Sequence, residues 1–281
     1  MKLIDHIYEQ GMPPKNSEDA WGVTETAAWV LDGATGLSKK QFVAIEGQTD
    51  PRWLMDTATE FLKSYADDTD DIATLYERVL KDCEAAYTEA LGGEDIDKGH
   101  RASGASLIIK QDGHTITCGA LSDCALLIET ADGVDIMPPC PVHAAVDDYA
   151  KGEMKKAIDA GATLLEARAT IADILMDQRR KLNTPEGHAN FVPDVSVLEH
   201  VRYRDFTVEH GAHALLMSDG FYALVEDYHA YDDAGLMSAA KGKGLAALYK
   251  ELRQIENNDP EGQKFVRTKK SDDATAVLVT L

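Results

Sequence analysis

Cysteine is scarce in this chain, and the few cysteines show no pattern of a binding site. Only four occur among the 281 residues, with no C-x-x-C pair and no histidine nearby at the spacing of a zinc site. Neither a disulfide framework nor a structural zinc site is therefore indicated. We interpret the cysteines as small buried hydrophobic residues of a protein in a reducing compartment.

Long apolar runs are missing as well. No stretch approaches the roughly 18 apolar residues that a membrane-spanning helix needs. The first ten residues, MKLIDHIYEQ, carry charges where a signal peptide needs an apolar run. These absences predict a soluble protein that stays in the cytoplasm.

Positive charge is the third scarcity. The chain has 28 Lys and Arg against 49 Asp and Glu, which gives a formal net charge of −21. A surface of that sign repels the phosphates of nucleic acids and of anionic lipids. Aromatic residues make up 7% and do not alternate with basic ones, so no stacking platform for bases is visible. We therefore expect neither nucleic acid nor membrane as a partner, and the sequence indicates no oligomeric state.

The remaining composition is that of an ordinary globular protein. Hydrophobic residues account for 44% and charged residues for 27%, without repeats, low-complexity segments or a long linker. We predict a single domain over residues 1–281.

The period of the apolar residues changes several times along the chain. Helical spacing is found at 53–65, 72–91, 146–182 and 228–252. Strand-like runs lie at 3–8, 20–23, 27–31, 107–109, 115–121, 125–129, 195–198, 206–208, 214–217 and 276–281. Because strands and helices come in groups rather than in regular alternation, this order favours an α+β fold with antiparallel sheets and flanking helices. Periodicity alone leaves open whether there are one or two sheets.

Four short motifs place an acidic residue at the edge of an apolar run, at residues 16–20, 29–36, 215–220 and 271–275. Taken singly, each is also typical of a turn or a helix N-cap. Asp112-Gly113 and Asp132-Gly133, for example, lie between strand-like runs and look like plain hairpin turns. Asp32-Gly33 and Asp219-Gly220 differ, because each follows a strongly apolar run that would deliver the carboxylate at the end of a buried strand.

A carboxylate at the end of a buried strand needs a partner. Burying the charge is costly unless it is paired or bound to a metal, and a glycine directly after it lets the backbone approach a ligand closely. Several such carboxylates suit the hard cations Mg²⁺ and Mn²⁺. Two ions about 4 Å apart can activate a water and hold a phosphoryl group. We therefore predict phosphate-ester hydrolysis at a two-metal site around Asp32, Asp219 and Asp272.

Six segments, in their order along the chain, resemble the motifs of the metal-dependent protein phosphatases, the type 2C serine/threonine family, in its bacterial form. Residues 17–20 resemble its N-E-D-A element, and residues 215–220 its L-L-x-S-D-G element nearly letter for letter. The others are residues 32–36, 102–106, 121–126 and 272–275. Each motif is weak alone, whereas the ordered set spans effectively the whole chain.

The resemblance implies a fold and a mechanism. The fold is a four-layer α-β-β-α sandwich, in which helix pairs flank two antiparallel sheets. The activity is hydrolysis of phosphoserine and phosphothreonine in proteins by a metal-bridging water, with Mn²⁺ or Mg²⁺ as two ions and a possible third. The implied metal ligands are Asp32, the Gly33 carbonyl, Asp219, Asp272, Glu18 or Asp19 and, for the third ion, Asp123.

The sequence departs from the family pattern at the phosphate-binding position and near Asp123. Pro14 occupies the place of the family's arginine, so Lys15, Arg101 or no protein cation would contact the substrate phosphate. The segment Ser122-Asp123-Cys124-Ala125 lacks the usual glycine and the following arginine. Residues 138–193 fall at the family's flap and match it least.

These departures leave two further functions open. One is a catalytically weak or inactive regulator that keeps the fold and binds phosphoproteins. The other is a phosphatase that acts on a small phosphorylated metabolite.

Overall fold

The computed structural model describes residues 1–13, 15–38, 40–45 and 47–281. Ten strands form two five-stranded antiparallel sheets, ordered β1-β10-β9-β6-β7 and β2-β3-β4-β5-β8. The strands are β1 (Lys2–Glu9), β2 (Ala20–Val23), β3 (Ala27–Gly33), β4 (Gly104–Asp112), β5 (Thr115–Leu121), β6 (Ala125–Thr130), β7 (Gly133–Met137), β8 (Arg202–Thr207), β9 (His213–Met217) and β10 (Ala274–Thr280).

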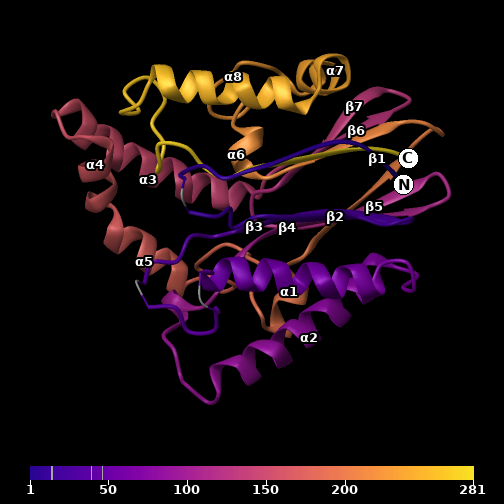
Figure 1. The fold of residues 1–281 in the computed structure, drawn as a ribbon, viewed down its shortest axis with the longest axis horizontal. Helices are drawn as coiled ribbons and strands as arrows, with labels where there is room; N and C mark the ends of the chain where they lie inside the picture. The colour runs from indigo at the N-terminus through magenta and orange to yellow at the C-terminus, as the bar shows by residue number, and fades with distance from the viewer. Residues whose placement is uncertain (14, 39, 46) are drawn as a thin grey trace.

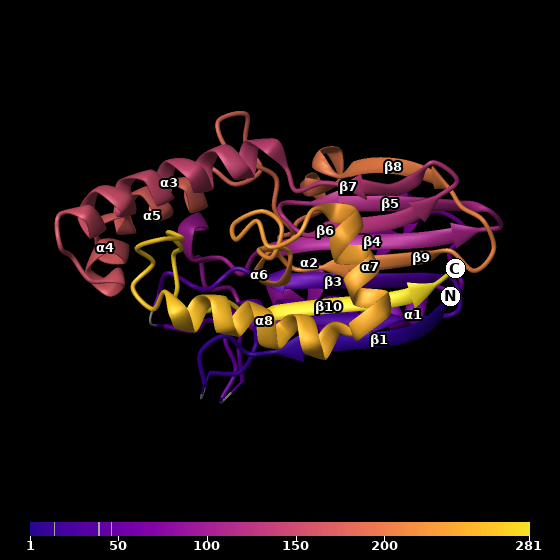
Figure 2. The ribbon, with the colours of Figure 1, turned by 90° about the horizontal axis from the view of Figure 1, so that it is seen from above.

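Helices lie on the outer faces of the two sheets and at one side of them (Figure 1 and Figure 2). They are α1 (Asp50–Tyr65), α2 (Ile72–Leu91), α3 (Pro141–Asp159), α4 (Leu164–Thr170), α5 (Ala172–Arg180), α6 (Asp219–Tyr222), α7 (Asp233–Lys243) and α8 (Leu245–Asn258), with short 3₁₀ turns η1 (Lys98–His100) and η2 (Val195–His200). Figure 1 shows α1 and α2 below the sheets and α7 and α8 above them, with the two chain ends side by side. The predicted four-layer α-β-β-α sandwich is confirmed.

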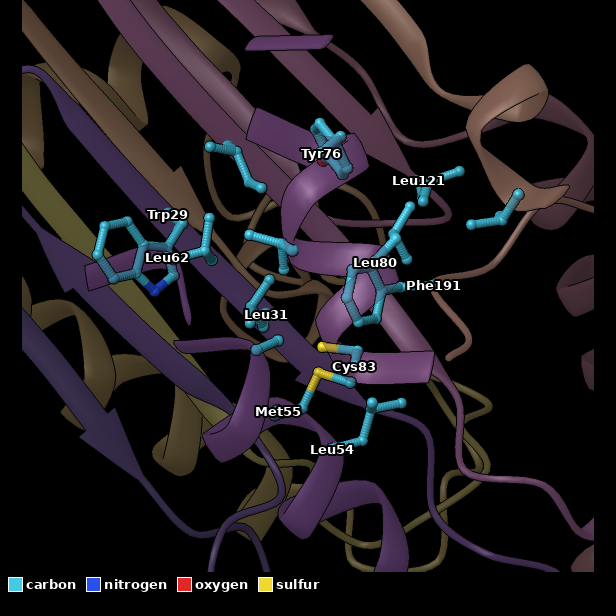
Figure 3. Packing of buried hydrophobic residues seen from close by; sticks show 14 of the residues in the cluster. Trp29, Leu31, Leu54, Met55, Leu62, Tyr76, Leu80, Cys83, Leu121 and Phe191 are labelled. Atoms are coloured by element: carbon cyan, nitrogen blue, oxygen red, sulfur yellow. The ribbon is translucent and has the colours of Figure 1, made fainter. Parts of the chain in front are cut away.

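Strand β3 shows why the sandwich has three apolar layers. Its side chains alternate between the two faces of the sheet, and both faces are buried. Trp29 and Leu31 pack against α1 and α2 (Figure 3), whereas Ala28 and Val30 face the other sheet. Burying a large apolar side chain is worth about 1.5–3 kcal/mol, so these layers fix β3 from both sides.

The two helices beneath β3 begin and end at recognisable signals. The Thr49 side chain accepts a hydrogen bond from the backbone of Arg52 at the start of α1, and Asp71 caps α2 in the same way. Gly92 ends α2 in the left-handed conformation at φ 58°. These caps satisfy backbone groups that the helices leave unpaired at their ends.

The segment that the sequence marked as divergent forms α3, α4 and α5, to one side of the sandwich (Figure 2). These helices have a small apolar cluster of their own, which includes Met154 and Ile171. None of the helices in the described residues has the length and apolar character that crossing a bilayer requires.

One predicted strand is wrong. Residues 195–198 belong to the 3₁₀ turn η2, because the Asp194 side chain accepts a hydrogen bond from the backbone of Ser196 and bends the chain there. Polar side chains that bond their own backbone in this way favour turns over strands.

Candidate active site

Asp32 and Gly33 form the last two positions of β3, a strand inside its sheet. Asp32 lies opposite Ala105 of β4, and Gly33 lies opposite Gly104. A Cβ atom on Gly33 would come within 2.5 Å of the Glu18 carbonyl oxygen. Glycine is therefore required here, because the chain before β2 passes directly against the end of β3.

Asp219 and Asp272 come from adjacent strands of the other sheet. Asp219 follows β9 and begins α6, whereas Asp272 precedes β10. Ser218 joins the two segments: its backbone donates to the Thr275 carbonyl at 3.0 Å, and its Oγ accepts from the Thr275 backbone at 3.0 Å. Ser218 and Thr275 are fully buried, and this pair of hydrogen bonds holds the two aspartates at the same end of the sheet.

Asp123 lies in the connection between β5 and β6, which joins the two sheets. The preceding residue, Ser122, has φ 67° and is 2% exposed. This is the left-handed conformation that normally favours glycine, and the sequence has serine where the resembled family has glycine. The carboxylate of Asp123 lies 3.2 Å from His143 Nε2 of α3.

The aspartates from these distant segments line one cavity of about 180 Å³. Asp32, Asp123, Asp219 and Asp272 contribute to its wall, as does Gly33. A neighbouring cavity of about 270 Å³ shares Asp123, Asp219 and Asp272. We call the first of these the acidic cavity.

The carboxylates of the acidic cavity repel one another. Burial raises the pKa of Asp32 well above its ordinary value, and the charges of Asp19, Asp219 and Asp123 add to the effect. Burial likewise raises the pKa of Asp219, followed by the charge of Asp272. Without a cation, both carboxylates are therefore in an unfavourable environment.

Among the described residues, Asp19 has a carboxylate oxygen that is suited to bind a metal ion. Its side chain is fully buried, and its Oδ2 accepts a hydrogen bond from Thr275 Oγ1 at 2.7 Å. Its Oδ1 is buried without a partner among the described residues. Burial and the charge of Asp273 raise the pKa of Asp19 to about 7. A buried carboxylate oxygen with no partner suits a hard divalent cation or a water bound to one.

Glu18 is fully bonded within the protein and does not line the acidic cavity. It accepts hydrogen bonds from Thr35 Oγ1 at 2.7 Å, Thr49 Oγ1 at 2.6 Å and Lys15 Nζ at 2.6 Å. The Lys15 ammonium is thus paired with Glu18. Pro14, which stands where the family has its arginine, lies outside the described residues.

Three cationic side chains line the acidic cavity, and sequence reasoning missed all of them: Arg168, Arg179 and Lys269. Lys269 Nζ lies 2.6 Å from Asp272 Oδ1. Burial would lower the pKa of Lys269, but Asp272 and Asp219 outweigh it, so the pKa is raised. Burial alone would raise the pKa of Asp272, but the Lys269 ammonium more than offsets this effect, so the pKa of Asp272 is lowered.

The two arginines come from the divergent helical segment. Arg179 donates to Ser103 Oγ at 3.1 Å and to the carbonyl oxygens of Ala34 and Thr35 at 3.4 and 3.3 Å. Burial lowers its pKa to about 10. Arg168 has a buried Nη1 atom without a partner in the described part of the chain. No sequence signal identified them, because helical spacing does not tell which face of α4 and α5 meets the cavity.

The carboxylates line one cavity, but those of the described residues are not arranged as a metal-coordination shell. Within residues 1–13, 15–38, 40–45 and 47–281, no group of three or more His, Cys, Asp or Glu side chains is arranged to hold a metal ion. Four of the aspartates nevertheless line the same cavity, and the charges of Asp219, Asp123 and Asp272 help to raise the pKa of Asp32. The donor set itself, all carboxylate oxygen with one unpartnered atom, fits a hard divalent cation.

Comparisons with known proteins agree with this architecture. Neither a family model nor a curated protein sequence matches the chain. Among solved structures, the Mycobacterium tuberculosis serine/threonine phosphatase PstP/Ppp is 15% identical, with a TM-score of 0.57 over 100% of this chain and 99% of its own. The PPM Ser-Thr phosphatase MsPP from Mycobacterium smegmatis, in complex with cacodylate, is 18% identical, with a TM-score of 0.54 over 100% of each chain.

A third structure is the catalytic domain of PstP in complex with 2 manganese ions. It is 14% identical and covers 97% of this chain and 95% of its own, with a TM-score of 0.55. At such identities the likeness establishes the fold. The chain therefore has the fold of the bacterial PPM, or type 2C, serine/threonine phosphatases, and the predicted resemblance is confirmed at that level.

Proposed function

We propose that this chain is a metal-dependent phosphatase that hydrolyses phosphoserine and phosphothreonine in proteins. The observation that carries the proposal is the meeting of Asp32, Asp219 and Asp272, from three distant segments, in one cavity of a phosphatase fold. When bound there, two Mn²⁺ or Mg²⁺ ions, with a possible third at Asp123, would supply an activated water and neutralise the phosphoryl group. The manganese ions of the PstP catalytic domain support this choice of metal.

The residues of the chain would bind the cations and the substrate phosphate. Asp32, Asp219, Asp272, the Gly33 carbonyl and Asp19 would hold the cations, with Glu18 orienting its neighbours through Thr35 and Thr49. For the substrate phosphate, the sequence predicts Lys15. Arg168 is a second candidate, because a guanidinium with an unpartnered nitrogen at the cavity wall can bind two phosphate oxygens at once.

The test is metal-dependent turnover by the purified protein. We expect hydrolysis of p-nitrophenyl phosphate and of a phosphothreonine peptide with Mn²⁺ and none with EDTA. Asp219→Asn should lose at least about 100-fold in kcat, since even outer-shell partners of metal sites account for about 10- to 100-fold. Asp132→Asn is the matched control, because its Asp-Gly pair lies exposed in the hairpin between β6 and β7. Equal activity of the two variants would defeat the proposal.

One observation favours a second candidate function. The Lys269 ammonium already neutralises Asp272, which is the arrangement expected of a non-catalytic protein that binds phosphoproteins without a metal. That function predicts phosphopeptide binding in EDTA and no turnover with Mn²⁺. A phosphatase of small metabolites would instead show a higher kcat/KM on a phosphorylated metabolite than on the peptide.

A further inference from the structure

A second, basic cavity adjoins the acidic cavity and shares Arg179 with it. It measures about 80 Å³ and is lined by Lys98, Arg101, Arg179 and Arg180, with Asp194 as its one acidic residue. That is roughly the room that two or three water molecules occupy in the liquid. We call it the basic cavity. Its existence is unexpected in a chain with a net charge of −21.

The cavity forms where α5 packs against η1. Gly99 makes this contact possible, since a Cβ atom there would come within 2.5 Å of Met176 Sδ and 3.2 Å of Arg180 Cγ. The close approach brings Lys98 and Arg101, at η1, next to Arg179 and Arg180, at the end of α5. Two pairs of like charges are thereby held together by the fold.

The protein balances only part of this charge. Arg180 pairs with Asp97 at 3.0 Å, and Arg179 bonds to Ser103 and to backbone carbonyls. Lys98 and Arg101 make no ion pair with the described residues, and the Arg101 Nε atom is buried without a hydrogen-bond partner. Asp194 contributes one negative charge, and its Oδ1 already accepts the backbone N–H of Ser196.

We propose that the basic cavity binds a phosphate-type oxyanion, at a site separate from the acidic cavity. A tetrahedral oxyanion accepts hydrogen bonds from several directions, and guanidinium groups bind its oxygens in pairs. Ser103 adds a hydroxyl, since its Oγ accepts from Arg179 and keeps its own hydrogen free to donate. The anion is either free inorganic phosphate or a second phosphate group on a phosphorylated protein.

Because Arg179 and Leu182 line both cavities, the two sites share a wall. A phosphate group in the basic cavity would therefore lie beside a second phosphate group in the acidic one. This placement suits a substrate segment that carries two phosphorylated residues. The binding itself does not depend on the proposed phosphatase activity.

The experiment is a calorimetric titration of the full chain with inorganic phosphate in EDTA at physiological ionic strength. Lys98 and Arg101 line the basic cavity and not the acidic one, so the loss of binding on replacing both assigns the bound phosphate to the basic cavity. We expect saturable one-to-one binding, weakened at least tenfold in Lys98→Gln/Arg101→Gln. Lys63→Gln/Lys81→Gln is the control, since it removes the same charge from two exposed ion pairs on α1 and α2.

The outcomes decide the proposal. Absence of saturable binding to the wild type, or equal weakening by the two double variants, would overturn it. If the first variant folds poorly, Lys98→Gln alone serves, because Lys98 is exposed. Peptides with one and with two phosphothreonines then identify the source: tenfold tighter binding of the second peptide, lost in the variant, indicates the substrate, and equal binding indicates free phosphate.

Discussion

Replacing Asp19 by asparagine should make the metal-free protein more stable at alkaline pH and less stable at acid pH. The pKa of this carboxyl group rises from 3.8 to about 7 on folding, mainly because it is buried and then because of Asp273. A group whose pKa is raised in the folded state contributes its full stability below the unfolded pKa. That contribution is lost as the pH rises through the folded pKa.

The size of the effect follows from the two pKa values. A difference of about three pH units at about 1.4 kcal/mol each gives a penalty of about 4 kcal/mol above pH 7. Asparagine removes that penalty but leaves a buried amide without a partner where Oδ1 lies, at a cost of about 1–3 kcal/mol. The variant should therefore be more stable by about 1–3 kcal/mol near pH 8 and less stable by a similar amount near pH 4.

Urea unfolding in EDTA, followed by circular dichroism at both pH values, measures this difference. Burial lowers the pKa of His188 to about 3, which makes the wild type lose stability as the pH falls below 6.5. The comparison of variant with wild type cancels this contribution, because both contain His188. Asp132→Asn, in an exposed hairpin turn, is the control. A stability difference for Asp19→Asn that does not change between the two pH values would refute the reasoning.

Three other substitutions test the geometry. Ser122→Gly should stabilise the protein by about 1 kcal/mol in a thermal melt, because φ 67° is strained for serine; no gain would contradict that conformation. Gly33→Ala should cost about 1–3 kcal/mol by overlap with the Glu18 carbonyl, whereas Gly36→Ala, whose nearest atom is 4.0 Å away, should change little. Lys269→Met should raise Mn²⁺ affinity at least about tenfold, or about 1.4 kcal/mol, by removing a competing cation; calorimetry that finds unchanged or weaker affinity would show that Lys269 does not compete.

The sequence predicted the site best where a buried strand ends in an acidic residue. Apolar runs that end in Asp-Gly predicted both the strands and the place where Asp32 and Asp219 emerge. It failed where a side chain bonds its own backbone, as at Asp194, which turns residues 195–198 into η2. It predicted a hairpin turn at Asp132-Gly133 but gave no range for the strand that follows, β7, because the half-polar GVDIM does not stand out as an apolar run.

The cationic residues of the acidic cavity could not be predicted from the sequence, for a different reason. Arg168 and Arg179 lie on helices whose spacing is readable, but the docking of α4 and α5 against the sandwich depends on contacts such as the one between Met176 and Gly99. Lys269 lies in a loop, where no period indicates direction. Its ammonium pairs with Asp272, in a segment that lies directly against the start of α6: a Cβ atom on Gly220 would come within 3.1 Å of Asp272 Cβ.

The most direct test of the two-metal site is the number of ions that it holds. A crystal soaked in Mn²⁺ and measured at the manganese absorption edge should show two anomalous peaks in the acidic cavity, both in contact with Asp32. In Asp32→Asn at least one peak should be lost, while Asp132→Asn keeps both. An absence of manganese from the cavity in the wild type, with Lys269 still bonded to Asp272, would contradict the account.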